Sequence, residues 1–507
     1  MTGAGTCAPS DTASSTLVVP FFPGYPHTGS LLQWRTQIAQ ALAQGQRLLS
    51  LFGRGNAPTP DVVVTALLLG KAGLRVIRGQ GTVGDTYPSL SAEFPQAQIY
   101  ERELWEQTGI VPAQHPWLKP VRFEGQRLGQ CETYPFFSMR GAELHEVGVG
   151  PIHAGVIEPG HFRFICHGET VHHLEIQLGY QHRGVEALLL QRPPHRHSAL
   201  VESMVGDSVI AYASAFHTTL EHLSLQPPPA AVRASRAVAL ELERIAMHVS
   251  TLSGLAMDLA FVQAGATYQR LRTAIINATQ GLCGNRFGRG WIRPGGATAL
   301  NRNQRAALAH TLERFLRDFV QVNHLVRTRR SVRARFQGIG VLAAPAPTEL
   351  GLSGVIARAS GVALDLRSAL PDALMGAPAP ITEPGGDCWA RMVLRMRETE
   401  TSTHWLLERL GDAALDLDCA PPRTPQPGAH DWPLLPHALG LSVVEGVRGP
   451  VLVALETGPT GQLVHAKVQD PSLANWFGLA QALRGQQISD FPICNKSFDL
   501  SYCGNDL

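Results

Sequence analysis

At 507 residues, with 44% hydrophobic and 17% charged residues, the chain has the composition of a globular protein with room for two or more domains. The net charge of +2 gives no case for nucleic-acid binding, which requires a clustered basic face. No apolar run approaches the ~20 residues that span a bilayer, so any membrane association would go through partners.

The eight cysteines are scattered, and no two have the C-x-x-C spacing of a zinc knuckle or a thioredoxin-type pair. Because no secretory signal precedes them, they predict a reducing, cytoplasmic compartment. They stand at positions 7, 131, 166, 283, 388, 419, 494 and 503.

The N-terminal quarter predicts a tail followed by a small domain. Residues 1–28, rich in Thr, Ser, Gly and Pro, predict a flexible tail. Residues 29–125 predict a compact α+β domain, in which Ser30 caps a helix. The apolar runs Val62–Leu69 and Leu74–Ile77 predict paired strands.

A second helix is predicted in FPQAQIYERELWEQTGI, ending at Gly109. Its three acidic residues, Glu101, Glu103 and Glu106, are expected to form a solvated helix face. They carry no predicted chemistry.

The stretch Gly148–Glu186 predicts a small antiparallel sheet. Phe162 and Phe164 alternate as in a strand, and Gly168 with Glu169 predicts a hairpin turn. Nine histidines fall between positions 145 and 197, and most are expected to be surface or hydrogen-bonded groups.

Amphipathic helices follow and predict a bundle over about residues 200–415. A Pro-rich linker at about 420–436 then leads to a β-rich segment at 437–507. The expected fold class is therefore α+β. The bundle helices are predicted at Ser208–Leu223, at Ala231–Phe261, after Gln269, and at Asn303–Arg330.

The stretch Cys283–Ala297 is dense in Gly and Arg. The guanidinium groups of Arg286, Arg289 and Arg293 could grip a carboxylate or phosphate. It lacks the G-x-G-x-x-G pattern, so no nucleotide-binding fingerprint is met.

Several segments resemble one protein family. GPIHAG…EPGHFRF…GYQHRGVE resembles the start of the large subunit of membrane-bound, energy-converting nickel–iron hydrogenases, and the homologous quinone-site subunit of respiratory complex I. YERELWEQTGI…HPWLKPV resembles the accessory subunit of complex I, which formate-hydrogenlyase-type hydrogenases carry fused ahead of the large subunit. FGRG…RPGG, GLSGVIARASG, GDCWARMVLRMRE and EGVRGPV match further family segments. The resemblance implies an accessory-like domain at 29–125 and a large-subunit-like domain at 140–507.

The family holds its nickel–iron centre with two C-x-x-C pairs, because soft thiolates bind nickel. By the resemblance, the four ligand positions are Val205, Ser208, Ser501 and Gly504, with Cys503 displaced by one. Valine cannot ligate a metal, and serine is a poor substitute for thiolate. The chain is therefore expected to bind no metal or cofactor through ligands of its own.

Complex I lost the same cysteines and uses the cavity for a quinone headgroup. The resemblance implies that His153 and Asp258 form a quinone-protonating pair, with Asp207 as an alternative proton relay. The family's quinone-binding tyrosine is missing, since no tyrosine lies between Tyr180 and Tyr212.

The implied role is the cavity-forming subunit of a membrane-associated, complex-I-like NADH–quinone oxidoreductase, with electron transfer coupled to ion translocation. The implied partners are an iron–sulfur small subunit, a ferredoxin-like subunit and integral membrane subunits, on the cytoplasmic side of the inner membrane. Two alternatives stay open: a non-catalytic scaffold, and a hydrogenase with unusual ligands. Active hydrogenases are usually clipped beyond the last cysteine, and a chain ending at Leu507 offers no such tail.

Overall fold

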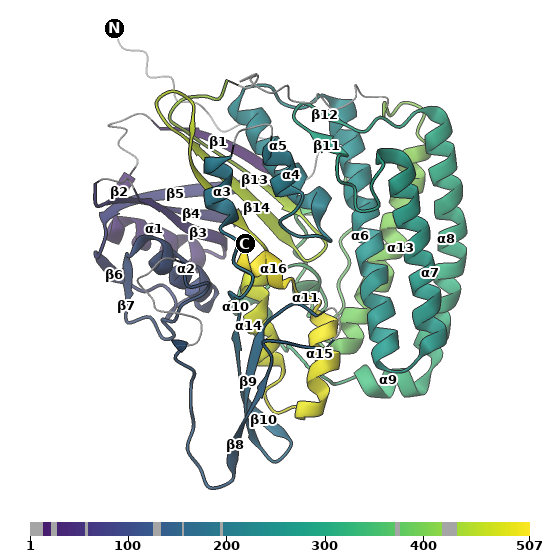
Figure 1. The fold of residues 1–507 in the computed structure, drawn as a ribbon, viewed down its shortest axis with the longest axis horizontal. Helices are drawn as coiled ribbons and strands as arrows, with labels where there is room; N and C mark the ends of the chain where they lie inside the picture. Colours follow the sequence, from purple (N-terminus) through teal and green to yellow (C-terminus); the bar gives the residue numbers. More distant parts are fainter. Residues whose placement is uncertain are drawn as a thin grey trace.

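The computed structural model describes residues 14–21, 28–55, 59–124, 133–154, 157–192, 196–370, 376–417 and 433–507. Figure 1 shows an N-terminal α+β block in purple, a helical bundle in teal and green, and between them a sheet with yellow C-terminal helices. The predicted α+β class is confirmed.

The N-terminal block is a four-stranded sheet with two helices packed on it. The strand order is β2-β5-β4-β3, and β4 with β5 is the predicted strand pair. Ser30 caps α1 as predicted, in a capping box with Gln33. α2 ends at Gly109, whose φ of 79° suits glycine. The bounds are β2 Thr28–Ser30, α1 Leu31–Ala43, β3 Arg47–Gly55, β4 Asp61–Gly70, β5 Gly73–Thr82, β6 Thr86–Pro88, α2 Gln98–Thr108 and β7 Val111–Ala113.

The prediction that Glu101, Glu103 and Glu106 form a solvated face is wrong. All three side chains are buried. Glu101 accepts hydrogen bonds from the backbone N–H of Leu90, Glu106 from that of Arg122, and Glu103 forms ion pairs. A helical sequence pattern shows which face of a helix is polar, but it does not show whether water or another part of the protein covers that face. Here further segments of the chain cover it.

Four long helices form the predicted bundle. Each of α6, α7, α8 and α13 packs against the next, and α13 packs back on α6. One face of α8, which includes Leu308, Phe315 and Phe319, is apolar and buried. α7 begins earlier than predicted, directly after Phe261. The bounds are α6 Ala230–Asp258, α7 Val262–Cys283, α8 Arg302–Thr328 and α13 Cys388–Gly411.

Shorter elements surround the bundle. The predicted sheet at 148–186 is confirmed as the antiparallel order β10-β9-β8, with the turn at Gly168. The bounds are β8 Leu144–Val149, β9 His161–His167, β10 Thr170–Gln177, α3 Val185–Gln191, α4 His197–Val201, α5 Val209–Leu223, β11 Ile292–Arg293, β12 Gly296–Ala297, α9 Arg330–Phe336, α10 Ala346–Glu349, α11 Gly354–Arg358 and α12 Leu366–Ala369.

The C-terminal segment contributes a sheet of order β1-β13-β14-β15. β1 comes from the predicted flexible tail, so that prediction is wrong for these residues, which pair with β13. The segment is also less β-rich than predicted, since helices fill its second half. The bounds are β1 Thr16–Pro20, β13 Ala438–Glu445, β14 Pro450–Thr457, β15 Leu463–Gln469, α14 Ser472–Ala482, α15 Phe491–Phe498 and α16 Tyr502–Asp506. The predicted linker lies mostly outside the described residues.

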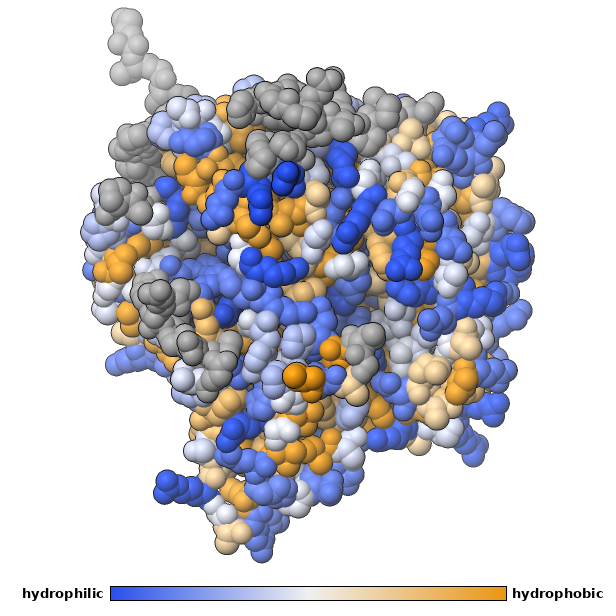
Figure 2. Space-filling model, in the orientation of Figure 1, coloured by the Kyte–Doolittle hydropathy of each residue, from blue (hydrophilic) through white to orange (hydrophobic). Residues whose placement is uncertain are grey.

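The two four-stranded sheets share one apolar core. Phe52 and Leu67 of the N-terminal sheet cluster with Leu439 and Leu452 of the C-terminal sheet. Leu507 is buried where the blocks meet, and the C-terminus lies near the centre of Figure 1. Figure 2 shows mainly polar residues over the bundle and apolar patches towards the β8–β10 hairpin. Within the described ranges, no helix has the length and apolar character of a membrane span.

Candidate functional site

The segments that carry the four expected nickel-ligand positions lie side by side. Arg183, just before α3, donates a hydrogen bond to the carbonyl of Met204 at 2.8 Å and to that of Cys503 at 3.1 Å. One guanidinium group therefore joins the loop 204–208 to the C-terminal segment. Val205 and Cys503 also belong to one apolar cluster, with Leu507.

Arg448 forms a second bridge between these segments. Its Nη1 and Nη2 lie 2.9 and 2.7 Å from the two carboxylate oxygens of Asp207, and its Nε donates to the carbonyl of Asp499. Burial alone would lower the pKa of Arg448, but Asp207 and Asp499 outweigh burial and raise it well above its usual value. Burial alone would raise the pKa of Asp207, but the positive charge of Arg448 outweighs burial, and the pKa is lowered. Both groups stay charged, so Asp207 is a poor proton relay.

The four positions have structural roles in place of metal binding. Val205 is a buried apolar residue, and Ser208 precedes the first residue of α5. Ser501 caps α16, because its hydroxyl accepts a hydrogen bond from the N–H of Gly504 at 2.9 Å. None of these groups supplies a thiolate.

Gly504 shows that a nickel site does not fit. A Cβ atom at this position would lie 2.5 Å from Oδ2 of Asp470. That oxygen is held in place, since it accepts a hydrogen bond from the hydroxyl of Tyr212 at 2.6 Å. A cysteine could enter here only if the buried Tyr212–Asp470 pair moved.

Cys503 does not replace the missing ligands. Burial, with a contribution from Glu158, raises the pKa of its thiol to about 12. A thiol is a poor metal ligand compared with a thiolate. Over the part of the chain that the structure describes, no three His, Cys, Asp or Glu residues form a group that could hold a metal ion.

The loop 204–208 and the C-terminal segment 499–507, joined by Arg183 and Arg448, form a junction. Glu243 of α6 is a buried carboxyl beside it. It accepts hydrogen bonds from the N–H groups of Ile210 at 2.6 Å and Ala211 at 3.2 Å, in the first turn of α5. Burial raises its pKa to about 8, although these two bonds oppose the shift. Glu243 and Asp207 line a cavity of about 20 Å³, which has room for a water molecule. This carboxyl can therefore exchange a proton near neutral pH.

Two histidines brace the loop between β8 and β9. His153 Nε2 donates to the carbonyl of Gly160 at 2.8 Å, and His161 Nδ1 donates to that of Gly150 at 3.1 Å. A carbonyl oxygen only accepts, so both of these ring nitrogens carry hydrogen. The loop packs on the C-terminal segment, because a Cβ at Gly160 would lie 2.8 Å from the ring of Tyr502. His153 thus lies close to the junction.

Asp258 has a different environment. It ends α6 and lines an open groove with Phe261, Arg329 and Arg335. No hydrogen bond or ion pair between described residues joins it to His153. The structure does not bring the predicted pair together.

The Gly- and Arg-rich stretch Cys283–Ala297 makes its polar contacts with other parts of this protein. Arg293 pairs with Glu202, and the N–H of Gly295 donates to Glu221 at 2.7 Å. Arg286 stacks 4.8 Å from the centre of the Phe287 ring. These contacts use two of the three guanidinium groups that were expected to bind an anion.

Comparison with known proteins finds two family models that match separate parts of the chain. Residues 258–413 match the family described as respiratory-chain NADH dehydrogenase, 49 Kd subunit, and residues 36–129 match the 30 Kd subunit of the same enzyme. The two matches follow one another in a single chain, first the 30 Kd subunit family and then the 49 Kd subunit family. The resemblance predicted from the sequence is thereby confirmed.

Relatives share this organisation. Formate hydrogenlyase subunit 5 of Escherichia coli is 28% identical over 83% of this chain and 77% of its own length. An NADH-quinone oxidoreductase subunit of Bacteroides thetaiotaomicron is 25% identical over 81% of this chain and 83% of its own length. A chain of the membrane-bound sulfane sulfur reductase, an archaeal respiratory membrane complex, shares the fold with a TM-score of 0.64 at 21% identity, covering 72% of this chain and 99% of that one.

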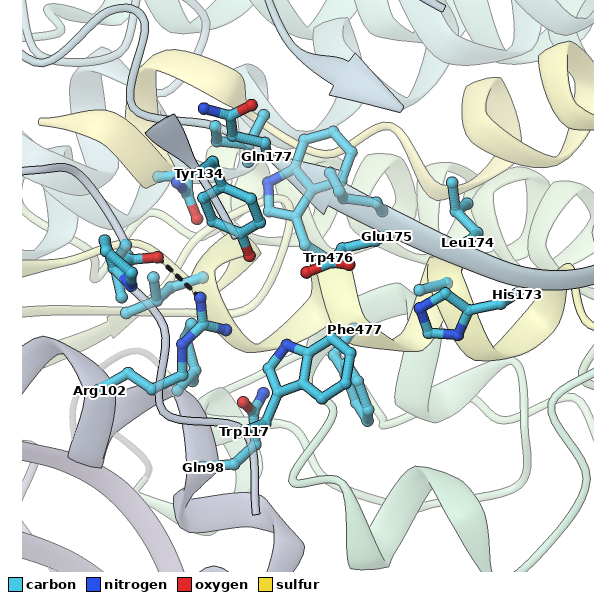
Figure 3. A pocket seen from close by; sticks show the side chains of 18 residues that line it. Gln98, Arg102, Trp117, Tyr134, His173, Leu174, Glu175, Gln177, Trp476 and Phe477 are labelled. Carbon is cyan, nitrogen blue, oxygen red and sulfur yellow. Dashed lines mark hydrogen bonds between the residues drawn. The ribbon is translucent and has the colours of Figure 1, made fainter. Parts of the chain in front are cut away.

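The two domains also meet at an aromatic pocket of about 70 Å³. Figure 3 shows Trp117 and Tyr134, which follow α2 of the 30-kDa domain, opposite His173, Trp476 and Phe477 of the 49-kDa domain. The aromatic rings pack the domain border, and Arg102 and Glu175 also line the pocket.

Sequence reasoning missed the residues that organise the junction. Arg448 and Arg183 lie in EGVRGPV and HRGVE, two of the segments that carry the resemblance, but no ligand or carboxylate spacing indicates that they bridge two segments. Tyr212 lies beyond the interval in which the family places its tyrosine, and its partner Asp470 is 258 residues away. Only these family segments could have pointed to the site.

Proposed function

We propose that this chain is the fused 30-kDa and 49-kDa subunit of a membrane-associated, hydrogenase-related oxidoreductase of the complex-I type, and that it works without a nickel–iron centre. Arg448 carries this proposal, because it pairs with Asp207 and donates to the carbonyl of Asp499, and so joins the two segments that would otherwise supply nickel ligands. The relatives named as formate hydrogenlyase and NADH-quinone oxidoreductase subunits support the subunit role.

Electron transfer in this proposal depends on partner subunits. An iron–sulfur small subunit, a ferredoxin-like subunit and integral membrane subunits would supply the redox centres and the ion path. The fused subunit would bind peripherally through them, on the cytoplasmic side of the inner membrane. Its own contribution is to shape the cavity that receives the electrons.

A quinone is the proposed electron acceptor, with His153 as the group that would contact it. Since Nε2 donates to Gly160, Nδ1 is the nitrogen left for a quinone oxygen, and it would donate a hydrogen bond to that oxygen in the imidazolium form of the ring. Pairing with Asp258 would require a rearrangement of the loop. Asp207 would hold Arg448 in place instead of relaying protons.

The test is the metal and quinone content of the complex purified from its own membranes. We expect no stoichiometric nickel, bound quinone in the wild-type complex, and loss of that quinone in His153→Ala. His172→Ala is the matched control, because His172 is an exposed histidine on the same small sheet. Stoichiometric nickel would overturn the proposal, and unchanged quinone in His153→Ala would remove the role of His153.

A scaffold is the second candidate function, and the close packing of Gly504 against Asp470 favours it. In that case the subunit would only link partner subunits mechanically. Absence of both nickel and quinone, with loss of assembly when the subunit is deleted, would establish this alternative.

A further inference from the structure

Two buried cysteines lie beside one arginine where α13 meets α15. Cys388 is the first residue of α13, Cys494 lies within α15, and both side chains are completely buried. Nη2 of Arg391 lies 3.3 Å from Sγ of Cys388 and 3.9 Å from Sγ of Cys494. One guanidinium nitrogen therefore contacts both sulfur atoms.

Arg391 is buried without a carboxylate partner. Its remaining hydrogen bonds go to neutral acceptors, namely Ser497 Oγ at 2.9 Å and the carbonyls of Gly340 and Gly386. No ion pair with an acidic group is formed within the described ranges. Burying an unpaired charge is costly, so a nearby anion is favoured. The anion within reach is a cysteine thiolate.

The two sulfur atoms differ in protonation. Burial would raise the pKa of the Cys388 thiol, but Cys494, Arg391 and Ser497 lower it to about 6. The hydrogen bond to Cys388 and burial raise the pKa of Cys494 well above its usual value. A thiolate next to a thiol is the arrangement of a nucleophilic cysteine and its resolving partner.

We propose that Cys388 and Cys494 form a redox-active pair that hydrogen peroxide oxidises to a disulfide between α13 and α15. The Cys388 thiolate attacks one peroxide oxygen, the O–O bond breaks, and a sulfenic acid and hydroxide form. The Cys494 sulfur then attacks the sulfenic sulfur, the S–O bond breaks, and water leaves. The two sulfur atoms lose two electrons. The peroxide oxygens end as one water molecule, which carries the Cys494 proton, and one hydroxide ion, which the buffer protonates.

Oxidation would reach the nickel-ligand positions through a short segment. α15 leads directly into Asp499, whose carbonyl accepts from Arg448. Arg395 of α13 also donates to the carbonyl of Ser497 at 2.8 Å. A covalent bond between α13 and α15 would therefore restrain the segment that holds Arg448.

The test treats the reduced, full-length protein with hydrogen peroxide, followed by acid quenching, alkylation and peptide mass spectrometry. We expect a linked peptide that contains positions 388 and 494. Cys388→Ser should abolish it, and Cys283→Ser, at a half-buried cysteine whose thiol pKa is raised, should not. Recovery of both cysteines as free thiols, under conditions that oxidise Cys283, would overturn the proposal.

A second measurement does not need oxidation. Thiolates absorb near 240 nm, so Cys388→Ser should remove the absorbance of one thiolate at pH 7.5, and Cys283→Ser should remove none. Arg391→Gln should slow disulfide formation about tenfold or more, because it raises the fraction of unreactive thiol. Equal absorbance in wild type and Cys388→Ser would show that no thiolate is present and would overturn the assignment.

Discussion

Lys467 of β15 donates a hydrogen bond to Glu103 of α2 at 2.7 Å, although 364 positions separate them in the sequence. Both side chains are almost completely inaccessible, and Arg122 pairs with the same carboxylate. Burial would favour neutral groups, but the opposite charges win: the pKa of Lys467 is raised and that of Glu103 is lowered. A buried ion network thus crosses the border between the 30-kDa and 49-kDa domains.

Glu103→Ala should therefore be strongly destabilising. It leaves the buried Arg122 without its carboxylate and Lys467 with Glu186 alone, and breaking such buried pairs costs about 3–5 kcal/mol. Urea unfolding of the full-length protein at pH 7 measures the loss. Asp318→Ala is the control, because its ion pair with Arg270 is exposed and should contribute less than about 1 kcal/mol. Similar losses in the two variants would contradict the buried network.

Arg448→Met should disturb the junction more than Asp207→Asn. The first change leaves the partly exposed carboxylates of Asp207 and Asp499 without their guanidinium partner, at a cost of about 1–3 kcal/mol. The second leaves Arg448 with Asp499, whose carbonyl and carboxylate it contacts. Thermal unfolding of both variants gives the comparison. An equal effect would mean that Asp499 does not support Arg448.

Glu243→Gln should flatten the pH dependence of stability. The folded-state pKa of about 8 exceeds the ordinary value of 4.5, so the folded state keeps a proton that the unfolded state releases. Stability from this group is complete below pH 4.5 and is lost as pH rises towards 8. Unfolding free energies of the wild type and the variant, measured from pH 5 to 8, should converge as pH falls and separate as it rises. Parallel curves would show that Glu243 titrates normally.

Gly504→Ala should destabilise the C-terminal segment. The added methyl group would meet the carboxylate of Asp470, which Tyr212 holds, and overpacking of this kind costs about 1–3 kcal/mol. Gly206→Ala is the control in the adjacent loop, because a Cβ there has nothing within 4 Å. The melting temperatures of the two variants, each compared with that of the wild type, measure the loss of stability. A neutral Gly504→Ala would mean that Asp470 gives way easily, and that a cysteine could fit.

Local chemistry made several elements predictable. Ser30 caps α1 because its side chain bonds to the backbone three residues away, and Gly109 ends α2 because glycine accepts a positive φ. The β9–β10 hairpin follows from its short turn at Gly168. Each of these signals acts over a few residues, so the sequence contains it in full.

Elsewhere predictions from local sequence patterns failed, because contacts between residues far apart in the sequence decide the structure. Glu103 has the pattern of a surface residue, and only the approach of Lys467 from β15 makes it a buried one. β1 has a tail-like composition, yet it finds a hydrogen-bonding edge at β13. The His153–Asp258 pair rested on family position, and the loop hydrogen bond from His153 to Gly160 now occupies one ring nitrogen.

The sequence by itself determined the family resemblance, the order of its two parts and the absence of cysteines at the nickel-ligand positions, because these depend on residue identity and local spacing. The tertiary structure alone decided what stands in their place. Arg448 pairs with Asp207, and Tyr212 holds Asp470 against Gly504, across more than 200 residues in each case. The physical reason is that buried charges and polar groups must find partners, and folding, not sequence proximity, brings those partners within reach.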